Sequence, residues 1–176
     1  MKTFRQYIEF IDDQSKRLEF SVLNELNELG LEYFIYEHPP LRTVKESKAL
    51  RGEIHGGHTK NLFLRDKKKK NYLITVNETQ KIDLKFLESE LSTGRLSFGS
   101  PERLLQFLGV KPGAVSPLAL INDKHNDVSF FIDHNLLSEN ILNFHPLVNH
   151  LTVSIRVKDF KYFLKSQNKF YNEIYF

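Results

Sequence analysis

A lysine at the junction between a glycine-rich loop and an apolar strand is the first candidate for chemistry. It is Lys60, which follows Gly56 and Gly57 and precedes the run 61–64 (Asn-Leu-Phe-Leu). A lysine on a rigid strand can point into a cleft and hold a phosphate as a point charge. The alternative is an ordinary surface lysine at a strand start. The glycines do not form the Walker A pattern, so they predict no nucleotide-binding loop.

A second candidate is the small-residue loop 113–117, which reads Gly-Ala-Val-Ser-Pro. Such a loop could present backbone N–H groups to an oxyanion or a water. It is not a nucleophile elbow, because the G-x-S-x-G pattern needs serine at the third position and Ser116 is the fourth. A plain tight turn is the alternative interpretation.

Histidines supply the third candidate. His145 and Asn149 stand just before an apolar strand and could line the mouth of a pocket, although a hydrogen-bonded structural histidine is the commoner case. His55 and His58 are three residues apart, but the chain has no cysteine and no H-E-x-x-H pattern. We therefore expect no metal and no cofactor. The lysine run 67–70 would suit a phosphate backbone or, by default, a solvated hairpin tip.

Length and composition favour one globular domain. The chain has 176 residues, is 40% hydrophobic and contains 15 phenylalanines, enough for one sizeable core. No apolar run reaches the roughly 18 residues that span a bilayer, and the N-terminus is charged where a signal peptide would be apolar. A cytoplasmic protein without membrane association is expected. The formal charge of +3 permits a local basic face for RNA without requiring one.

The elements that must position these residues alternate between helices and strands. Helices are predicted near 4–11, from about Leu18 to Gly30, at 82–91, from Ser100-Pro101 to Gly109, and from Val157 through Leu164; a short one begins at Thr43, where Thr43 and Glu46 form a capping box. Strands are predicted at 31–36, 61–64, 72–76, 118–121, 128–132 and 151–155. The second and third strands form a hairpin around the charged turn 66–70. The fold class is α+β or mixed α/β.

The order of these motifs resembles the YbaK/ProX family of aminoacyl-tRNA editing domains. The matching strings are 38–41 (His-Pro-Pro-Leu) with 43–44, 50–53, the long string 57–66 containing Lys60, the loop 113–117 and 144–146 (Phe-His-Pro). The resemblance covers about Leu18 to Leu164 and looks closest to the freestanding prolyl-tRNA editing branch. It implies one domain with a central mixed, partly barrel-like sheet and flanking helices, at 18–166, between an N-terminal helical extension (1–17) and a C-terminal tail (167–176).

The resemblance also implies roles for residues. Lys60 would contact the 3′ end of the tRNA and be needed for activity, and Gly113 would open a loop that offers backbone groups to the scissile ester. The implied substrate-binding residues are His38, Thr43, Asn61, Ala114, Val115, Ser116, Pro117, His145 and Asn149. Water, helped by the ribose hydroxyl of the substrate, would be the nucleophile, without metal or covalent intermediate.

The expected activity is hydrolysis of mischarged alanyl-tRNA(Pro). An aminoacyl ester is already activated, so an enzyme need only position water and stabilise a developing oxyanion. The partner would be the acceptor end of tRNA(Pro), with transient contact to prolyl-tRNA synthetase or an elongation factor. Two alternatives stay open: another mischarged tRNA, such as cysteinyl-tRNA(Pro), or a catalytically silent module that binds tRNA or a synthetase.

Overall fold

The computed structural model describes residues 16–40 and 53–176. The described helices and strands, in chain order, are α2 (Lys16–Glu28), β1 (Tyr33–Glu37), β2 (Gly57–Arg65), β3 (Asn71–Asn77), α4 (Leu84–Glu90), β4 (Ser97–Phe98), α5 (Pro101–Leu108), the 3-10 helix η1 (Pro117–Asn122), β5 (Val128–Asp133), α6 (His134–Leu137), β6 (Ile141–Phe144), β7 (Leu151–Arg156), α7 (Val157–Ser166) and β8 (Tyr171–Ile174). The predicted N-terminal helix and the capping box at Thr43 lie outside the described residues.

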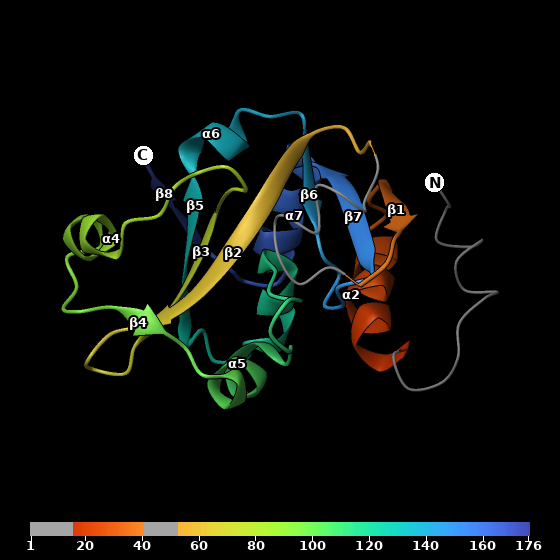
Figure 1. Cartoon of the computed structure of the whole chain (residues 1–176). Coiled ribbons are helices and arrows are strands. Elements are labelled where there is room, and N and C mark those ends of the chain that lie inside the picture. Colours follow the sequence, from red (N-terminus) through yellow and green to blue (C-terminus); the bar gives the residue numbers. More distant parts are fainter. Residues whose placement is uncertain (1–15, 41–52) are drawn as a thin grey trace.

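One mixed sheet organises the described part of the chain. Its strand order is β1-β7-β6-β2-β3-β5-β8, and β4 pairs with β2 to make eight strands. The pairs β2–β6, β3–β5 and β5–β8 are parallel, whereas the others are antiparallel. Figure 1 shows β2 running diagonally between the two parts of the sheet. The expected mixed α/β class is confirmed.

The predicted hairpin is present and longer than expected. Strand β2 pairs with β3 from Thr59↔Asn77 to Arg65↔Asn71. The side chain of Asp66 organises the turn between them, because its Oδ1 accepts the backbone N–H of Lys70 at 2.9 Å. The strand is thus a rigid support for Lys60.

Helix α5 begins and ends where its sequence predicts. The Ser100 side chain accepts a hydrogen bond from the N–H of Arg103, and Pro101 fills the first position. Gly109 ends the helix with φ 66°, a left-handed conformation that glycine adopts at little cost.

The predicted strand at 118–121 is wrong: these residues form η1. The Ser116 hydroxyl caps this helix by accepting the N–H of Leu118 at 3.2 Å, and Pro117 follows as the first helical residue. All residues from Pro117 to Ile121 are buried, so the segment is a short apolar run without alternation. Such a run does not distinguish a strand from a buried helix. The Ser-Pro start is the same signal that identifies α5.

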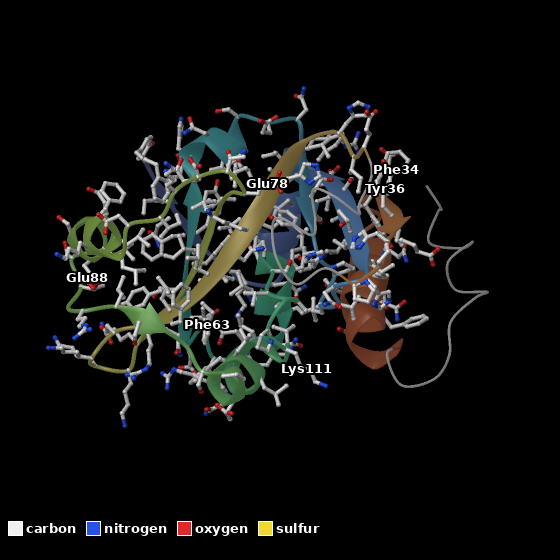
Figure 2. All side chains as sticks on the ribbon, in the orientation of Figure 1. Phe34, Tyr36, Phe63, Glu78, Glu88 and Lys111 are labelled. Carbon is white, nitrogen blue, oxygen red and sulfur yellow. The ribbon has the colours of Figure 1, made fainter. Side chains whose placement is uncertain are left out.

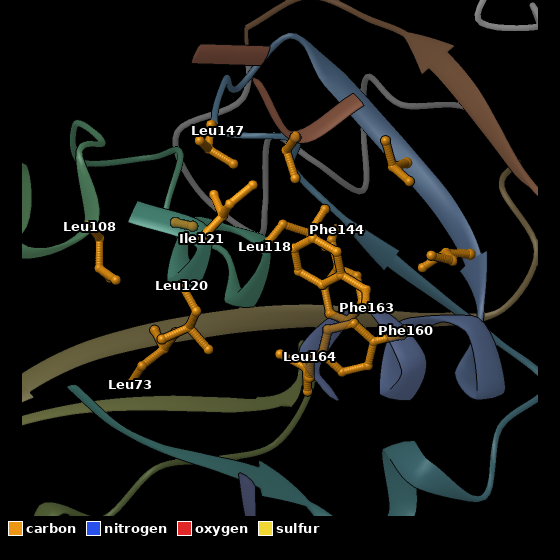
Figure 3. Close-up of a cluster of buried hydrophobic side chains, with 14 of the residues drawn as sticks. Leu73, Leu108, Leu118, Leu120, Ile121, Phe144, Leu147, Phe160, Phe163 and Leu164 are labelled. Atoms are coloured by element: carbon orange, nitrogen blue, oxygen red, sulfur yellow. The ribbon is translucent and has the colours of Figure 1, made fainter. Parts of the chain in front are cut away.

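Two apolar clusters lie on opposite faces of the β2–β3 hairpin. The larger one joins α2, α5, η1 and α7 to the sheet, and Figure 3 shows its centre, where Leu118, Phe144, Phe160 and Phe163 pack together. The smaller one places Leu87 of α4 and Ile174 of β8 against Leu62 and Leu64. Because β2 side chains alternate, Phe63 enters the larger cluster and its neighbours enter the smaller one.

The C-terminal residues beyond 166 also contribute to the sheet. Strand β8 pairs with β5 in parallel from Phe130↔Tyr171 to Asp133↔Ile174. Strands β4, β6 and β8 were not predicted, and neither was α6. In the part of the chain that the structure describes, no helix has the length and apolar character needed to cross a membrane.

Candidate functional site

The site begins where two parallel strands separate. Strands β2 and β6 pair only through Gly57↔Leu142 and His58↔Asn143. The hydroxyl of Thr59 then donates to the carbonyl oxygen of Asn143 at 2.9 Å. Beyond this point β2 continues with Lys60, whereas the chain after β6 turns away at His145. Ends of parallel strands that diverge are a common place for ligands in mixed α/β sheets.

Asn61 connects β2 to the predicted pocket loop. Its Nδ2 donates to the carbonyl oxygen of Val115 at 2.9 Å. Its Oδ1 accepts from the hydroxyl of Thr75, which lies opposite on β3, at 2.6 Å. Both ends of the Asn61 amide are therefore hydrogen-bonded, and the amide fixes the position of the loop relative to the sheet.

The loop 113–117 has little freedom. Gly113 has φ 92°, which a residue with a side chain rarely adopts. The N–H of Ala114 closes a turn on the carbonyl oxygen of Lys111 at 3.1 Å. Ala114, Ser116 and Pro117 are buried, and Val115 is half-buried. The loop is thus a rigid wall of small side chains, held by glycine at one end and by the cap of η1 at the other.

Lys60 points to the opposite face of β2 from Asn61. Its ammonium donates to the carbonyl oxygen of Gln80, in the segment after β3. Partial burial lowers the pKa of the Lys60 ammonium, and the nearby carboxylate of Glu78 opposes this shift. Glu78 is itself held to β2, since its N–H donates to the carbonyl oxygen of His58 at 2.9 Å (Figure 2). The ammonium is anchored but half-exposed.

His38 and His145 lie together although they are far apart in the chain. Their ring centroids are 5.9 Å apart. His38, just beyond β1, has its Nε2 2.9 Å from the hydroxyl of Thr152 on β7. His145 has its Nδ1 2.7 Å from the carbonyl oxygen of Leu151. A carbonyl only accepts, so Nδ1 carries the proton and the neutral ring keeps Nε2 as an acceptor.

Burial lowers the pKa of two histidines in this region, His145 and His150. It lowers the pKa of His145, and the hydrogen bond to Leu151 opposes the shift while His38 and His150 add to it. Burial also lowers the pKa of His150, with His38 acting in the same direction and Glu37 opposing. A neutral imidazole whose second nitrogen is an acceptor can receive a proton from water or from a ribose hydroxyl.

Lys60 and the histidines share one face of the sheet. Strand alternation and the pairings of β2, β6, β7 and β1 place on this polar face the residues His38, His58, Lys60, Asn143, Thr152 and Ser154. Asn143 is the centre of the buried part, because its Nδ2 donates to the carbonyl oxygen of His55 at 3.0 Å and its Oδ1 accepts from the hydroxyl of Ser154. The sequence prediction missed Asn143 and Thr152. Their signal is a polar residue inside an otherwise apolar strand.

Two predicted residues are not placed with the others. Thr43 lies outside the described residues. Asn149 is half-buried in the connection between β6 and β7, and within residues 16–40 and 53–176 no hydrogen bond or ring contact joins it to another predicted site residue. In the same ranges no hydrogen bond joins Lys60 to the loop 113–117.

The histidine pair that raised the question of a metal is not arranged as ligands. The Nε2 of His58 is 2.7 Å from the carbonyl oxygen of Ile54, and His55 is exposed. Over the described residues, no three His, Asp or Glu side chains gather closely enough to hold a metal ion.

Comparisons with known proteins identify the family of the chain. The family described as the aminoacyl-tRNA editing domain matches residues 38–163. The prolyl-tRNA editing protein ProX of Acetoanaerobium sticklandii is 35% identical over 155 residues, which cover 88% of this chain and 94% of that protein. The prolyl-tRNA synthetase associated domain-containing protein 1 of Mus musculus is 36% identical over 146 residues, covering 80% of this chain and 86% of its own.

A solved structure shares the fold. It is the crystal structure of a candidate trans-editing enzyme for prolyl-tRNA synthetase, with a TM-score of 0.66 and 21% sequence identity, and the match covers 93% of this chain and 98% of the other. At this identity the likeness concerns the fold, including the mixed sheet and its flanking helices.

Proposed function

Because the chain belongs to the aminoacyl-tRNA editing domain family and is an aminoacyl-tRNA deacylase, we propose that it hydrolyses alanyl-tRNA(Pro). The observation that carries the proposal is the Asn61 bridge, which holds the loop 113–117 against the strand that bears Lys60. The loop would receive the aminoacyl group, and the polar face would receive the terminal nucleotide.

Each group has a role in this scheme. Lys60 binds the 3′-terminal phosphate or ribose as a point charge. His145 lies on the same side of the sheet and presents a neutral acceptor nitrogen, which can orient the ribose hydroxyl or the attacking water. The backbone of Gly113 and its neighbours stabilises charge on the ester carbonyl. Water breaks the ester bond, and the amino acid leaves as a carboxylic acid while the ribose recovers its hydroxyl.

Selectivity would come from exclusion. One methylene of extra binding is worth only about 1–3 kcal/mol, so attraction alone cannot make a pocket prefer alanine strongly. Editing must spare the correct prolyl product, and steric refusal of the larger ring achieves this. The loop supplies the wall, because its small residues are buried and its ends are fixed.

The relatives suggest a setting for the reaction. The name of one relative mentions association with prolyl-tRNA synthetase. The proposal therefore includes the acceptor end of tRNA(Pro) as substrate and transient contact with that synthetase or an elongation factor.

A panel of charged tRNAs tests the proposal. Purified protein is incubated with alanyl-, seryl-, glycyl-, cysteinyl- and prolyl-tRNA(Pro), and release of the amino acid is measured. Alanyl-tRNA(Pro) should be hydrolysed fastest and prolyl-tRNA(Pro) negligibly. Similar rates for the alanyl and prolyl esters would refute the sieve. Fastest hydrolysis of the cysteinyl ester would identify cysteinyl-tRNA(Pro) as the substrate instead. Binding of tRNA without any hydrolysis would indicate a catalytically silent module.

The same assay tests the proposed absence of a metal. Activity should be unchanged in EDTA, because the proposed chemistry uses only water, the substrate and groups of the chain itself. Activity lost in EDTA and restored by zinc would overturn this mechanism.

A further inference from the structure

The positive charge of the chain is concentrated at one end of the β2–β3 hairpin. We define the basic turn cluster as Arg65, Lys67, Lys68, Lys69, Lys70 and Arg95, all of which are exposed. It holds six of the chain's 25 lysines and arginines. Of the chain's 22 acidic residues, only Asp66 lies within the turn residues 65–70. Since the formal net charge is only +3, the rest of the chain carries a slight excess of negative charge. The cluster is therefore a local excess of positive charge on the described surface.

The turn that carries the lysines is rigid. The Asp66 carboxylate is only 5% exposed and accepts both the N–H of Lys70 at 2.9 Å and the hydroxyl of Tyr72 at 3.2 Å. From α5, Arg103 donates to the carbonyl oxygen of Lys69 and to the side chain of Asn71. The Asp66 carboxylate thus borders the hollow but is almost fully buried and already hydrogen-bonded, while the cations are exposed. Figure 1 shows the turn beside β4, at the end of β2 remote from β6.

Two segments of the chain meet at a hollow in this surface. Its volume is about 260 Å³. It is lined by Arg65, Asp66 and Lys67 from the hairpin, by Arg95 just before β4 and by Ser97 of β4. Arg65 and Ser97 are paired across the two strands. A guanidinium can hold two oxygens of one phosphate, and a lysine adds a point charge, so the hollow has the donors that a phosphate group needs.

The separation from the site fits a nucleic acid with a paired stem and an unpaired end. Lys60 and Arg65 lie on the same strand, five residues apart, which corresponds to roughly 17 Å. A terminal nucleotide held at Lys60 would leave the paired stem at the basic turn cluster. Beside the hollow, Phe98 is 63% exposed and offers an apolar ring to a ribose.

We propose that the basic turn cluster binds the sugar–phosphate backbone of the acceptor stem of tRNA. This inference rests on the proposed function, because it takes the 3′ end of the tRNA to lie in the candidate site. The contact is with phosphates and so carries no base specificity. It contributes affinity and orients the stem so that the unpaired end reaches Lys60.

The test replaces three lysines and leaves the turn intact. The variant Lys67→Gln/Lys68→Gln/Lys70→Gln keeps Lys69, which has φ 64° and whose carbonyl accepts from Arg103. The matched control, Lys85→Gln/Lys158→Gln/Lys165→Gln, removes the same charge from exposed positions elsewhere. Binding of uncharged tRNA is measured by fluorescence anisotropy over a salt series. The turn variant should bind about tenfold or more weakly at low salt, with a salt slope smaller by about one for each phosphate that the variant no longer binds.

Deacylation kinetics then show whether the turn variant changes substrate binding or the chemical step. On charged tRNA the turn variant should raise KM and leave kcat unchanged, because the cluster does not touch the ester. On a short single-stranded oligonucleotide carrying the same aminoacyl ester, the variant and wild type should be alike. The control variant should match wild type in both assays apart from a small general loss of attraction.

The outcomes separate the two proposals. Unchanged tRNA affinity in the turn variant, or an equal loss of affinity in the control, would overturn the proposal that the basic turn cluster binds tRNA. So would intact tRNA binding combined with lost binding to anionic lipid vesicles, which would assign the cluster to a membrane surface. If wild type hydrolyses no charged tRNA but the turn variant still loses tRNA affinity, the proposed function fails and the surface stands.

Discussion

At the scale of single residues, Lys60 and Asn61 point to opposite faces of β2, because side chains alternate along a strand. Asn61 faces the loop 113–117 and holds it by a hydrogen bond, whereas Lys60 faces the polar side of the sheet with His38. A substrate bound at this point would be held from both faces where β2 and β6 separate. The adjacency of the two residues in the sequence is therefore what joins the two halves of the site.

Lys60 gives the first prediction. Lys60→Ala should reduce deacylation at least about 100-fold, because it removes the cation that we propose to hold the terminal nucleotide. The hydrogen bond to Gln80 is lost as well, but Gln80 is near the surface, so the fold should be kept. Turnover is measured with alanyl-tRNA(Pro), and circular dichroism verifies folding. The control is Lys81→Ala, at an exposed position nearby. Wild-type turnover in a folded Lys60→Ala protein would remove Lys60 from the mechanism.

Some residues of the candidate site could be predicted from the sequence and others could not, for a physical reason. Lys60 and the loop 113–117 stand beside glycine and proline, which mark unusual backbone within a few residues of the chain. Asn143 and Thr152 have no such local mark. They become part of the site only because β6, β7 and the end of β1 are brought together by pairing of distant segments.

At the scale of elements, the loop 113–117 depends on β2 for its position. The carbonyl of Val115 has its partner in Asn61, which in turn is fixed by Thr75. The cap of η1 at Ser116 holds the other side of the loop. The wall is thus as rigid as the strand and the 3-10 helix that flank it.

Asn61→Ala should therefore weaken discrimination. It releases the carbonyl of Val115 and the hydroxyl of Thr75, which should cost about 1–3 kcal/mol of folding free energy. A looser wall should admit the prolyl ring, raising the ratio of prolyl to alanyl hydrolysis about tenfold, equivalent to about 1.4 kcal/mol. Rates on both esters measure the ratio, with Asn135→Ala on α6 as the control. A loss of both rates in equal proportion would contradict the idea that Asn61 sets the wall.

Helices and strands were predicted correctly where residues nearby in the sequence mark their ends. Helix α5 has Ser100 and Pro101 at its start and Gly109 at its end, and its bounds agree with the prediction. Strands β6 and β8 have only four residues each, and β8 is exposed along much of its length. Their assignment depends on partners that are far away in the sequence, so no local pattern could show them.

Strand β8 is expected to contribute to stability. Ile174 is 3% exposed and packs with Leu64 and Leu87, so Ile174→Ala should lower the free energy of unfolding by about 2–5 kcal/mol. Phe170→Ala is the control, because that ring is 84% exposed and its loss should change stability by less than about 0.5 kcal/mol. Urea unfolding measures both. Equal stability of Ile174→Ala and wild type would show that β8 is dispensable for the fold.

At the scale of the whole molecule, the substrate would meet three regions joined by one strand. The basic turn cluster lies at one end of β2, and the polar face and the loop 113–117 lie towards the other, where Ala114 of the loop joins the larger apolar cluster. An RNA attracted by the turn would therefore reach the site along a rigid support. The buried histidines His145 and His150 add a second property of the whole fold, the dependence of its stability on pH.

The last prediction concerns that dependence. Burial lowers the pKa of His145 and of His150 in the folded protein, whereas an unfolded chain has histidines near their usual pKa of about 6.5. Below about 6.5 the unfolded state therefore binds more protons, and unfolding becomes easier as pH falls towards the folded pKa values. The contribution of these two histidines to the free energy of unfolding should not change with pH above about pH 7. Below about 6.5 it should decline as pH falls, by at most about 1.4 kcal/mol per pH unit for each histidine. Urea titrations between pH 5 and 8 measure it. His145→Gln, which can still donate to Leu151, should reduce the decline, while His125→Gln on an exposed turn should retain it. An identical decline in His145→Gln and wild type would mean that another group senses the proton.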